Sequence, residues 1–407
     1  MDLEKIKQKI RPDEKAILKE AGVFLARVNE LVKKNKINAT AIIGGSLAKG
    51  TFLKGDHDVD IFVKFSKEYE NEKLSDILEK ILKPLKAERV HGSRDYFVKH
   101  HNGMKYEIVP VYDVKSREEI VNITDASPLH FVWLKKQALK NQSLIEDIRL
   151  AKAFCKSIGA YGAESYIRGF SGHVLDILVA HYGSFMSLAR NAAKWEKPVV
   201  IDFNNVYNGQ AMERLNKAKI ESPLVLIDPI QPDRNAAAAL SREMFDKFIK
   251  SAKAFLKKPS EGFFERKEFS LSKIKNKNTI ILEVKPLEGK KDVVGSKLLK
   301  ALETIKMELE KNGFSVKSHG WHWNEKAYFW FSLKSMRIPK TFVHKGPPLK
   351  DQKNADNFRQ KYKRTFVKGK RIYAKVERKV TDAKKLVNEI LRNEIVKRNF
   401  RKAEVLQ

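Results

Sequence analysis

The clearest pattern in the chain is a short stretch in which apolar and charged residues alternate. Val59, Ile61 and Val63 are apolar, whereas Asp58 and Asp60, which alternate with them, are charged. A period of two places successive side chains on opposite faces of an extended chain, so this stretch predicts a β-strand. The two aspartates are therefore expected to share one face of that strand.

The remaining pattern predicts several separate folding units. Residues 1–36 are charged with helical spacing, and helical spacing returns at 140–192 and 234–258, with an asparagine-rich loop between them. A strand, a helix and two further strands are predicted, in this order, for residues 278–284, 297–311, 313–318 and 326–334. This order is consistent with a small ferredoxin-like α/β domain. Residues 381–405 predict a final basic helix.

The composition describes an ordered globular protein. A chain of 407 residues with 42% hydrophobic and 10% aromatic content is long enough for several domains with cores of their own. No apolar run of transmembrane length occurs, and the N-terminus lacks the apolar core of a signal peptide. The single cysteine, Cys155, excludes an internal disulfide and agrees with a location in the reducing cytoplasm.

The charge adds a class of partner to this picture. The formal net charge is +31, and residues 340–379 contain 14 Lys and Arg but only 3 Asp and Glu. Five aromatic residues are interleaved with this charge, namely Phe342, Phe358, Tyr362, Phe366 and Tyr373. Cations neutralise phosphates and aromatic rings stack on bases, so we expect an RNA surface here rather than a merely solvated face. The cations expected to contact RNA are Lys361, Lys363, Arg364, Lys370 and Arg371.

The Asp-x-Asp pair predicts a divalent-metal site. Asp58 and Asp60 lie about 6.6 Å apart along one strand face, where two carboxylates repel each other unless a cation lies between them. Mg²⁺ typically binds one or two carboxylates together with substrate phosphates. An EF-hand calcium loop starting two residues earlier is excluded, because Ile61 stands where glycine is needed and Lys67 where glutamate is needed.

A glycine-serine turn precedes the metal site. Gly44-Gly45-Ser46 follows the apolar strand predicted at residues 40–43. Glycines let backbone N–H groups approach a phosphate closely, and Ser46 adds a hydroxyl donor. A P-loop does not fit, because Lys49 comes before the second glycine, Gly50, instead of after it. The turn is thus expected to bind phosphates without being a P-loop.

These two elements together resemble a known signature. Gly45-Ser46, eleven intervening residues and Asp58-Val59-Asp60-Ile61 are similar to the motif of the polymerase-beta-like nucleotidyltransferase superfamily. The resemblance implies a third carboxylate on a later strand of the same sheet. Residues 105–112 form the candidate strand, and Glu107 is the only acid inside it.

Two neighbouring residues help to single out Glu107. Asp113 would point to the same face of an extended strand as Glu107, but it lies roughly 20 Å further along. Pro110 is expected to end regular strand pairing at that point. The superfamily more often has aspartate at this place, so Glu107 is a departure by one methylene group.

Later motifs narrow the resemblance to the archaeal, class I CCA-adding enzymes, which are tRNA nucleotidyltransferases. They lie at residues 127–134, 149–154, 160–164, 167–172, 228–229 and 233–237, and continue at 346–348 and 358–371. The resemblance implies that His130, Lys152, Tyr161 and Arg234 bind the nucleotide. By residue type alone, His130 and Tyr161 would be core residues and Lys152 a residue on a solvated helix face.

The resemblance also implies a multidomain α+β architecture. A nucleotidyltransferase palm with a mixed sheet would occupy residues 1–136, followed by a helical, nucleobase-binding neck at 137–260. A ferredoxin-like α/β body would occupy 261–345, and a basic RNA-binding segment with a tail helix 346–407.

The implied activity is the sequential addition of C, C and A to the 3′ end of tRNA. It would use CTP and ATP without a nucleic-acid template, and release pyrophosphate by a mechanism with two Mg²⁺ ions. Asp58 and Asp60 would hold both ions and Glu107 would complete the site. Ser46 and Lys49 would hold the β- and γ-phosphates.

Lys152 and Tyr161 would close on the triphosphate, and Arg234 would help to select C or A. The alternative is synthesis of poly(A) or oligoadenylate on the same palm. The sequence leaves open whether the chain is a monomer or a homodimer.

Overall fold

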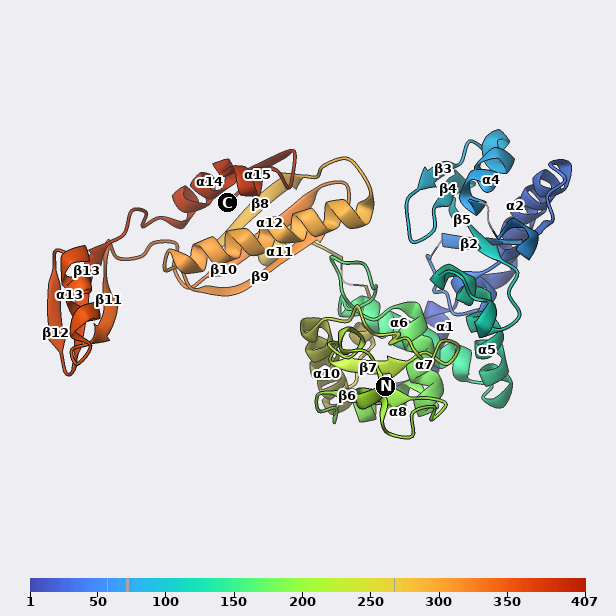
Figure 1. Ribbon diagram of the computed structural model, residues 1–407, viewed down its shortest axis with the longest axis horizontal. Coiled ribbons are helices and arrows are strands. Elements are labelled where there is room, and N and C mark those ends of the chain that lie inside the picture. The colour runs from blue at the N-terminus through green and yellow to red at the C-terminus, as the bar shows by residue number, and fades with distance from the viewer. Residues whose placement is uncertain (57, 71–72, 267) are drawn as a thin grey trace. The chain divides into compact units, whose positions relative to one another are not determined.

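The computed structural model describes residues 1–56, 58–70, 73–266 and 268–407. The chain divides into two compact units, residues 1–267 and 268–407, and each contains both helices and sheets (Figure 1). The predicted multidomain α+β class is confirmed. Among the described residues, no helix combines the length and the apolar character needed to cross a bilayer.

The first unit contains a mixed five-stranded sheet in the order β1-β2-β5-β4-β3. Its strands are β1 (Ala39–Ile43), β2 (Asp58–Phe65), β3 (Glu88–Val90), β4 (Tyr96–His101) and β5 (Met104–Tyr112). The strands β2 and β5 are parallel, and the other neighbours are antiparallel. The helices near this sheet are α2 (Glu14–Lys34), the one-turn α3 (Gly45–Ala48) and α4 (Leu74–Leu82), whereas α1 (Leu3–Ile10) packs with its Ile6 in the core of the helical region that follows.

One face of this sheet is apolar and is buried under α2 and α4. Val59 and Ile61 of β2 share a core with Phe24 of α2 and Leu78 of α4. Because neighbouring side chains of a strand alternate between faces, the residues between them point away from this core. The strand β2 therefore carries Asp58 and Asp60 on the sheet face that is not covered by α2 and α4.

The strand β5 continues past Pro110, so the prediction that pairing ends there was wrong. Val63 of β2 pairs with Pro110, and pairing with β2 goes on to Tyr112. On its other edge β5 pairs with β4 only as far as Ile108. Proline is tolerated in a strand where one edge has no partner, because its missing N–H then breaks no ladder bond.

A helical region completes the first unit. Its helices are α5 (Ser127–Lys140), α6 (Leu144–Ser157), α7 (Gly172–Tyr182), α8 (Phe185–Ala192), α9 (Ala211–Arg214) and α10 (Arg242–Lys257). The loop predicted between the helices contains two parallel strands, β6 (Val199–Asp202) and β7 (Leu224–Ile227). Phe154, Phe185, Phe248 and Phe255 lie at the centre of its core.

The helix predicted from residue 234 begins only at Arg242. The side chain of Asn235 accepts hydrogen bonds from the N–H groups of Leu226 and Ala237 and donates one to the carbonyl of Leu224. Asparagine side chains compete with helix formation by bonding to nearby backbone groups in this way. The helix starts instead after Ser241, whose hydroxyl accepts from the N–H of Met244 as an N-cap.

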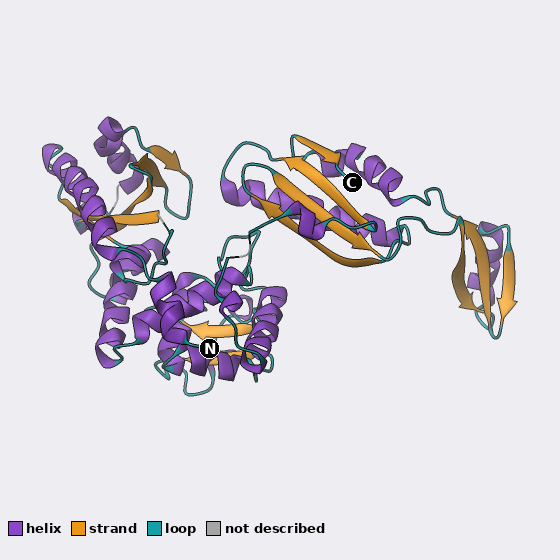
Figure 2. Ribbon diagram, turned by 180° about the vertical axis from the view of Figure 1, so that it is seen from behind, coloured by secondary structure: helices purple, strands orange, loops and turns teal. Residues whose placement is uncertain are grey.

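The second unit contains a four-stranded sheet in the order β14-β8-β10-β9, with helices packed against it (Figure 2). Its elements are α11 (Leu271–Ile274), β8 (Thr279–Lys285), α12 (Lys291–Lys311), β9 (Val316–Trp323), β10 (Ala327–Leu333), α14 (Ala383–Arg392), α15 (Glu394–Lys397) and β14 (Lys402–Val405). The strand, helix, strand, strand order predicted here agrees with β8, α12, β9 and β10.

The end of the chain is not the single helix predicted for residues 381–405. Asn393 ends α14 and its side chain caps α15 by accepting from the N–H of Ile395. The strand β14 then pairs with β8, and Ala403 and Val405 pack against the core. Their alternation with charged residues gives a period of two, which favours a strand once a sheet edge is available.

A separate three-stranded sheet in the order β11-β13-β12 lies between β10 and α14 in the sequence. Its elements are β11 (Thr341–Pro348), α13 (Gln352–Lys361), β12 (Thr365–Lys368) and β13 (Arg371–Glu377). Phe358 of α13 forms a small core with Ile372 and Ala374 of β13. One face of this sheet is therefore covered by α13.

Candidate active site

The register of β2 and β5 brings three carboxylates together. Asp58 lies opposite Lys105, and Asp60 lies opposite Glu107. Residues opposite each other in a sheet point to the same face, and so do residues two apart on one strand. The carboxylates of Asp58, Asp60 and Glu107 therefore lie on the face that is not packed against α2.

These carboxylates line one side of a cavity of about 310 Å³. Gly45, Ser46 and Lys49, from the turn after β1 and the one-turn α3, also line the cavity. The helical region supplies the other side, with Lys152, Tyr161, Gly172, His173 and Asp176. The structure thus gathers seven residues that the sequence predicted for catalysis, metal binding and nucleotide binding.

The electrostatics of the acidic side call for a cation. Burial, together with the neighbouring Glu107 and Asp58 carboxylates, raises the pKa of Asp60 to about 6. In this structure the Lys105 ammonium forms an ion pair with Glu107 and lies 3.9 Å from an oxygen of Asp58. Carboxylate oxygens are the ligands that Mg²⁺ prefers, so the donor set fits a divalent ion.

The backbone at Gly45 passes close to the Asp60 carboxylate. A Cβ atom at position 45 would lie 1.6 Å from Oδ2 of Asp60. The residue also has a φ angle of +56°, a conformation that side chains other than that of glycine rarely adopt. Only glycine therefore allows the turn after β1 to approach the acidic residues so closely.

Two lysines and a carboxylate form the wall opposite the acidic residues. The Lys49 ammonium donates to Oδ2 of Asp176 at 2.9 Å, and the Lys152 ammonium donates to the hydroxyl of Thr51 at 2.7 Å. Burial lowers the pKa of Lys152 to about 8, although the nearby Asp176 opposes this shift. Burial raises the pKa of Tyr161, so its hydroxyl stays a neutral hydrogen-bond donor.

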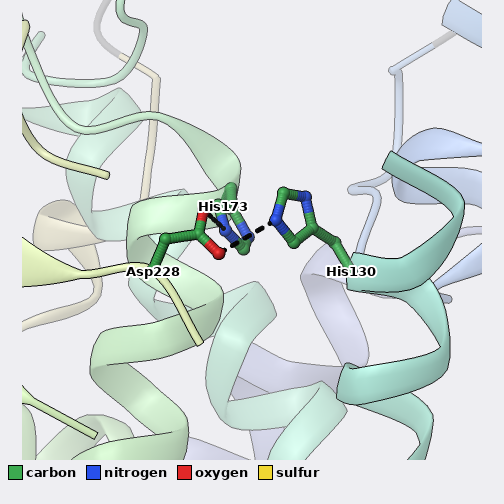
Figure 3. Close-up of side chains that lie close together, drawn as sticks. All are labelled: His130, His173 and Asp228. Atoms are coloured by element: carbon green, nitrogen blue, oxygen red, sulfur yellow. Dashed lines mark hydrogen bonds and ion pairs between the residues drawn. The ribbon is translucent and has the colours of Figure 1, made fainter. Parts of the chain in front are cut away.

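A second cluster adjoins the cavity through His173. Nε2 of His130 and Nε2 of His173 each lie 3.1 Å from a different oxygen of Asp228 (Figure 3). The two imidazole rings stack with centroids 3.8 Å apart. The Arg234 guanidinium donates to Asp228 at 2.9 Å, and two backbone N–H groups donate to its other oxygen.

This cluster has the spacing of a metal site but the donors of a hydrogen-bond network. The ligand atoms of His130, His173 and Asp228 lie within 4.8 Å of one another. However, Asp228 already accepts five hydrogen bonds from described residues, one of them from the cationic Arg234. Since a carboxylate only accepts, each Nε2 carries a hydrogen, and no lone pair there points at a shared ion.

The pKa values in this cluster agree with a network of this kind. Burial lowers the pKa of His173 to about 4, which keeps the imidazole neutral. Burial would raise the pKa of Asp228, but the hydrogen bonds from both histidines outweigh it and hold that pKa below its usual range. The cluster is therefore an ionised carboxylate that orients two imidazoles and one guanidinium.

Three residues of these clusters had no role predicted from the sequence. Asp228 lies in a motif singled out above, but no function was attached to it. His173 and Asp176 come one and four positions after the last motif glycine, Gly172, on α7. A spacing of three places both on one helix face, and this was the only sequence signal for them.

The cations predicted to contact RNA are spread along the three-stranded sheet. Lys361 ends α13, Lys363 and Arg364 lie in the connection to β12, Lys370 in the turn before β13, and Arg371 at the start of β13. The Arg371 guanidinium donates to the carbonyl of Gly346 at 2.9 Å, so it also holds β11 in place.

The open face of this sheet carries a pair of aromatic rings. Phe366 of β12 pairs with Tyr373 of β13, and their rings stack with centroids 5.7 Å apart. Ile372 and Ala374 face α13, so Tyr373 between them faces away from it. By strand register, four cations share the face of Tyr373, namely Lys345, Lys368, Arg371 and Lys375.

Three family models match successive parts of the chain. Residues 25–130 match a nucleotidyltransferase domain, and residues 146–265 match the second domain of tRNA nucleotidyltransferases. Residues 279–402 match the C-terminal domain of CCA-adding enzymes.

Curated relatives cover almost the whole chain. The CCA-adding enzyme of Nanoarchaeum equitans is 35% identical over 356 residues, which are 86% of this chain and 87% of the relative. That of Methanocaldococcus jannaschii is 29% identical over 96% of this chain and 90% of its own length. That of Pyrobaculum aerophilum is 31% identical over 92% and 89%.

Solved structures share the nucleotidyltransferase fold. The Cid1 poly(U) polymerase bound to Mg 3′-dATP has a TM-score of 0.51 at 14% identity, covering 65% of this chain and 97% of its own. A second Cid1 structure has a TM-score of 0.52 at 13% identity, with coverage of 66% and 97%. At this level of identity, the likeness concerns the fold alone.

Proposed function

The chain belongs to the archaeal CCA-adding enzymes, and on that premise we propose how its cavity and its basic sheet contribute to adding C, C and A to the 3′ end of tRNA. The observation that carries the proposal is the register that sets Glu107 opposite Asp60, with Asp58 beside them, on one wall of the cavity. As a member of the family, the protein adds CCA without a nucleic-acid template.

The acidic wall is proposed to hold the reacting groups. Two Mg²⁺ ions bound there would stabilise the attacking and leaving oxygens of an in-line displacement at the α-phosphate. Asp58 and Asp60 are the proposed ligands of both ions, and Glu107 completes the site. Gly45 keeps the backbone close to Asp60, so the acidic groups are held against a rigid turn.

The opposite wall is proposed to hold the triphosphate of CTP or ATP. Lys49 and Lys152 offer ammonium groups, and Ser46 and Tyr161 offer hydroxyl donors, all lining the same cavity. Cations and donors on one side and carboxylates on the other match a substrate whose phosphates are anionic and whose metal ions are cationic. The released product would be pyrophosphate.

The cluster around Asp228 is proposed to hold the nucleoside end of the substrate. The Arg234 guanidinium is a rigid fork of N–H donors, and among the described residues one of its nitrogens donates to Asp228. His130 is held in one tautomer by the same carboxylate. A base whose edge combines an acceptor with an amino group, as in cytosine and adenine, suits such fixed polar groups.

The three-stranded sheet is proposed to bind tRNA. Its open face combines stacked aromatic rings with cations, which suits unstacked bases and the phosphate backbone. The division into a palm at 1–136, a neck at 137–260, a body at 261–345 and an RNA-binding segment at 346–407 stays a prediction. The strand β14 of the last segment pairs with β8 of the body and so completes its sheet. The proposed setting is the cytoplasm, and the homodimer considered above stays a prediction.

Product sequencing tests this function. A tRNA lacking its last three nucleotides is incubated with the protein, Mg²⁺ and CTP, with or without ATP. We expect two added cytidines with CTP alone and a complete CCA end with both nucleotides. Repeated adenosines with ATP alone, and no cytidine from CTP, would instead support a poly(A)-type activity.

A further inference from the structure

We propose that Asp176 is a positioning residue that holds the Lys49 and Lys152 ammonium groups side by side for the phosphates of the substrate. This inference rests on the proposed function, in which the cavity binds a nucleoside triphosphate. It assigns a role to a carboxylate that lies outside the sequence motifs described above.

The contact geometry places Asp176 between the two lysines. Its side chain is only 1% exposed, and its two oxygens face different ammonium groups. Oδ2 accepts from Lys49 at 2.9 Å, while Oδ1 lies 3.8 Å from the nitrogen of Lys152 and has no hydrogen-bond partner among the described residues. One carboxylate therefore contacts two cations.

The three residues come from three different elements. Lys49 is the C-terminal cap of α3, Lys152 lies on α6 and Asp176 lies near the start of α7. Among the described residues, the Lys49 ammonium donates one hydrogen bond, to Asp176, and the Lys152 ammonium donates one, to Thr51. Each ammonium thus keeps donors for a ligand in the cavity.

The start of α7 is shaped to fit this wall. A Cβ atom at Gly172 would lie 3.1 Å from the hydroxyl of Tyr161 and 3.5 Å from the nitrogen of Lys152. Glycine at this position lets the helix approach both groups, and Asp176 follows one turn later on the same helix. The backbone of α7 therefore lies against Tyr161 and Lys152, and its carboxylate contacts Lys49 and Lys152.

The charges around Lys152 explain why a carboxylate is needed. Lys152 is buried, and it faces Lys49 from α3, Lys156 from its own helix, Asp176 from α7 and Asp56 from the loop before β2. Burial and the two neighbouring lysines disfavour its charged form, whereas the two aspartates favour it. Without Asp176, Lys152 would lose its proton closer to neutral pH.

Asp176 is itself kept ionised by its partners. Burial would raise its pKa, but Lys49 and Lys152 outweigh burial and hold the pKa below its usual value. The three groups thus form a mutually stabilised set, with two positive charges and one negative charge. An arriving triphosphate meets two cations that are already desolvated and correctly placed, which lowers the cost of ordering them.

The test measures binding of two probes, inorganic tripolyphosphate with Mg²⁺ and CTP with Mg²⁺, by calorimetry between pH 6.5 and 9.5. For Asp176→Asn we expect about threefold weaker binding at pH 7.5 and about tenfold weaker binding near pH 9, since Lys152 would lose its proton about one pH unit earlier. We also expect the pH at which binding weakens to move down by about one unit. Asp176→Glu, which keeps the charge, should largely restore both. Unchanged affinity and an unchanged pH profile in Asp176→Asn would overturn the proposal.

A matched control separates this role from the loss of a buried carboxylate in general. Asp147 is also buried on α6, where it accepts from the N–H of Phe185, but it does not line the cavity. Asp147→Asn should leave both probes and the pH profile unchanged. If Asp176→Asn does not fold, Asp176→Asn in a Lys49→Met background is compared with Lys49→Met alone. The same downward shift in pH is expected there, and its absence would contradict the proposal.

Failure of this inference differs from failure of the proposed function. Tripolyphosphate binding involves neither tRNA nor nucleotide transfer. If wild-type protein binds the probe, Asp176→Asn weakens that binding, and wild-type protein adds no nucleotide, the function alone is refuted. A wild-type protein that adds CCA, with an Asp176→Asn variant that binds both probes normally, would refute the positioning role alone.

Discussion

Asp60 and Glu107 face each other across the parallel strands β2 and β5. Asp113 follows just after the end of β5, and its carboxylate is engaged by Lys64 and Lys115 instead. The same segment of chain therefore supplies one carboxylate inside the cavity and one outside it. This difference gives the catalytic assignment a control within the protein.

Asp58→Ala, Asp60→Ala and Glu107→Ala should each reduce incorporation of labelled CTP into trimmed tRNA by about a thousandfold or more. Each change removes a proposed ligand of the metal ions that stabilise the transition state. Binding of tRNA, measured by filter retention, should change little. Asp113→Ala should keep its activity. Full activity in Asp58→Ala or Asp60→Ala would contradict the assignment of the metal ligands.

Gly45→Ala should abolish nucleotide incorporation, since the new Cβ would overlap the carboxylate of Asp60. The positive φ angle adds a cost of about 1–2 kcal/mol to the folded state. Gly103→Ala is the matched control, because Gly103 has a φ angle of +75° but a Cβ atom there would meet no described atom within 4 Å. Both variants should melt at lower temperature, but only Gly45→Ala should lose activity. Equal activity in both would show that the close approach to Asp60 is not needed.

Acid should weaken the first unit through His173. Its pKa of about 4 in the folded protein lies below the ordinary 6.5. Between these values the unfolded chain binds a proton that the folded protein excludes, so stability falls as the pH is lowered from 6.5 to 4. The loss at pH 5 relative to pH 7 should be about 2 kcal/mol. Asp228 stays ionised over this range in the folded protein, because its pKa is depressed there. In the unfolded chain an ordinary aspartate is ionised over most of the same range.

His173→Phe should remove most of this pH dependence, as measured by the melting temperature at pH 7 and pH 5. Phenylalanine keeps a ring against His130 but cannot take up a proton. His91→Gln is the control, since the His91 side chain is 83% exposed and should contribute little. An unchanged shift in melting temperature with His173→Phe would place the acid-sensitive group elsewhere.

Phe366→Ala and Tyr373→Ala should each weaken tRNA binding by about 1–3 kcal/mol, which is the usual contribution of an aromatic ring stacked on a base. The slope of log affinity against log salt should stay the same, because no cation is removed. Lys368→Ala should instead reduce that slope by about one. Val367→Ala is the control, since Val367 pairs with Ile372 and so points to the opposite sheet face. Tighter or unchanged binding in both aromatic variants would exclude this face as the RNA contact.

Local spacing explains what could be predicted. The face shared by Asp58 and Asp60 depends only on the period of two within one strand. The succession of β8, α12, β9 and β10 along the chain likewise depends on short-range patterns. The glycine-serine turn and the later motifs pointed to the family because they keep their spacing in the sequence. The failures at Pro110 and at residues 381–405 depended on neighbouring strands. Pro110 stays inside β5 because one edge of the strand has no partner there among the described residues, and residues 402–405 form a strand because an edge of β8 is available.

The sequence by itself thus determined which residue types carry the chemistry and the family to which they belong. Only the tertiary structure decided which charges meet. Lys49 and Asp176 are separated by 127 positions, and His130 and Asp228 by 98, so no local period relates them. Lys49 and Asp176 meet because α3 and α7 border one cavity, and His130 and Asp228 meet where α5 adjoins the segment after β7. Burial makes every unpaired charge costly and so favours the pairs that form.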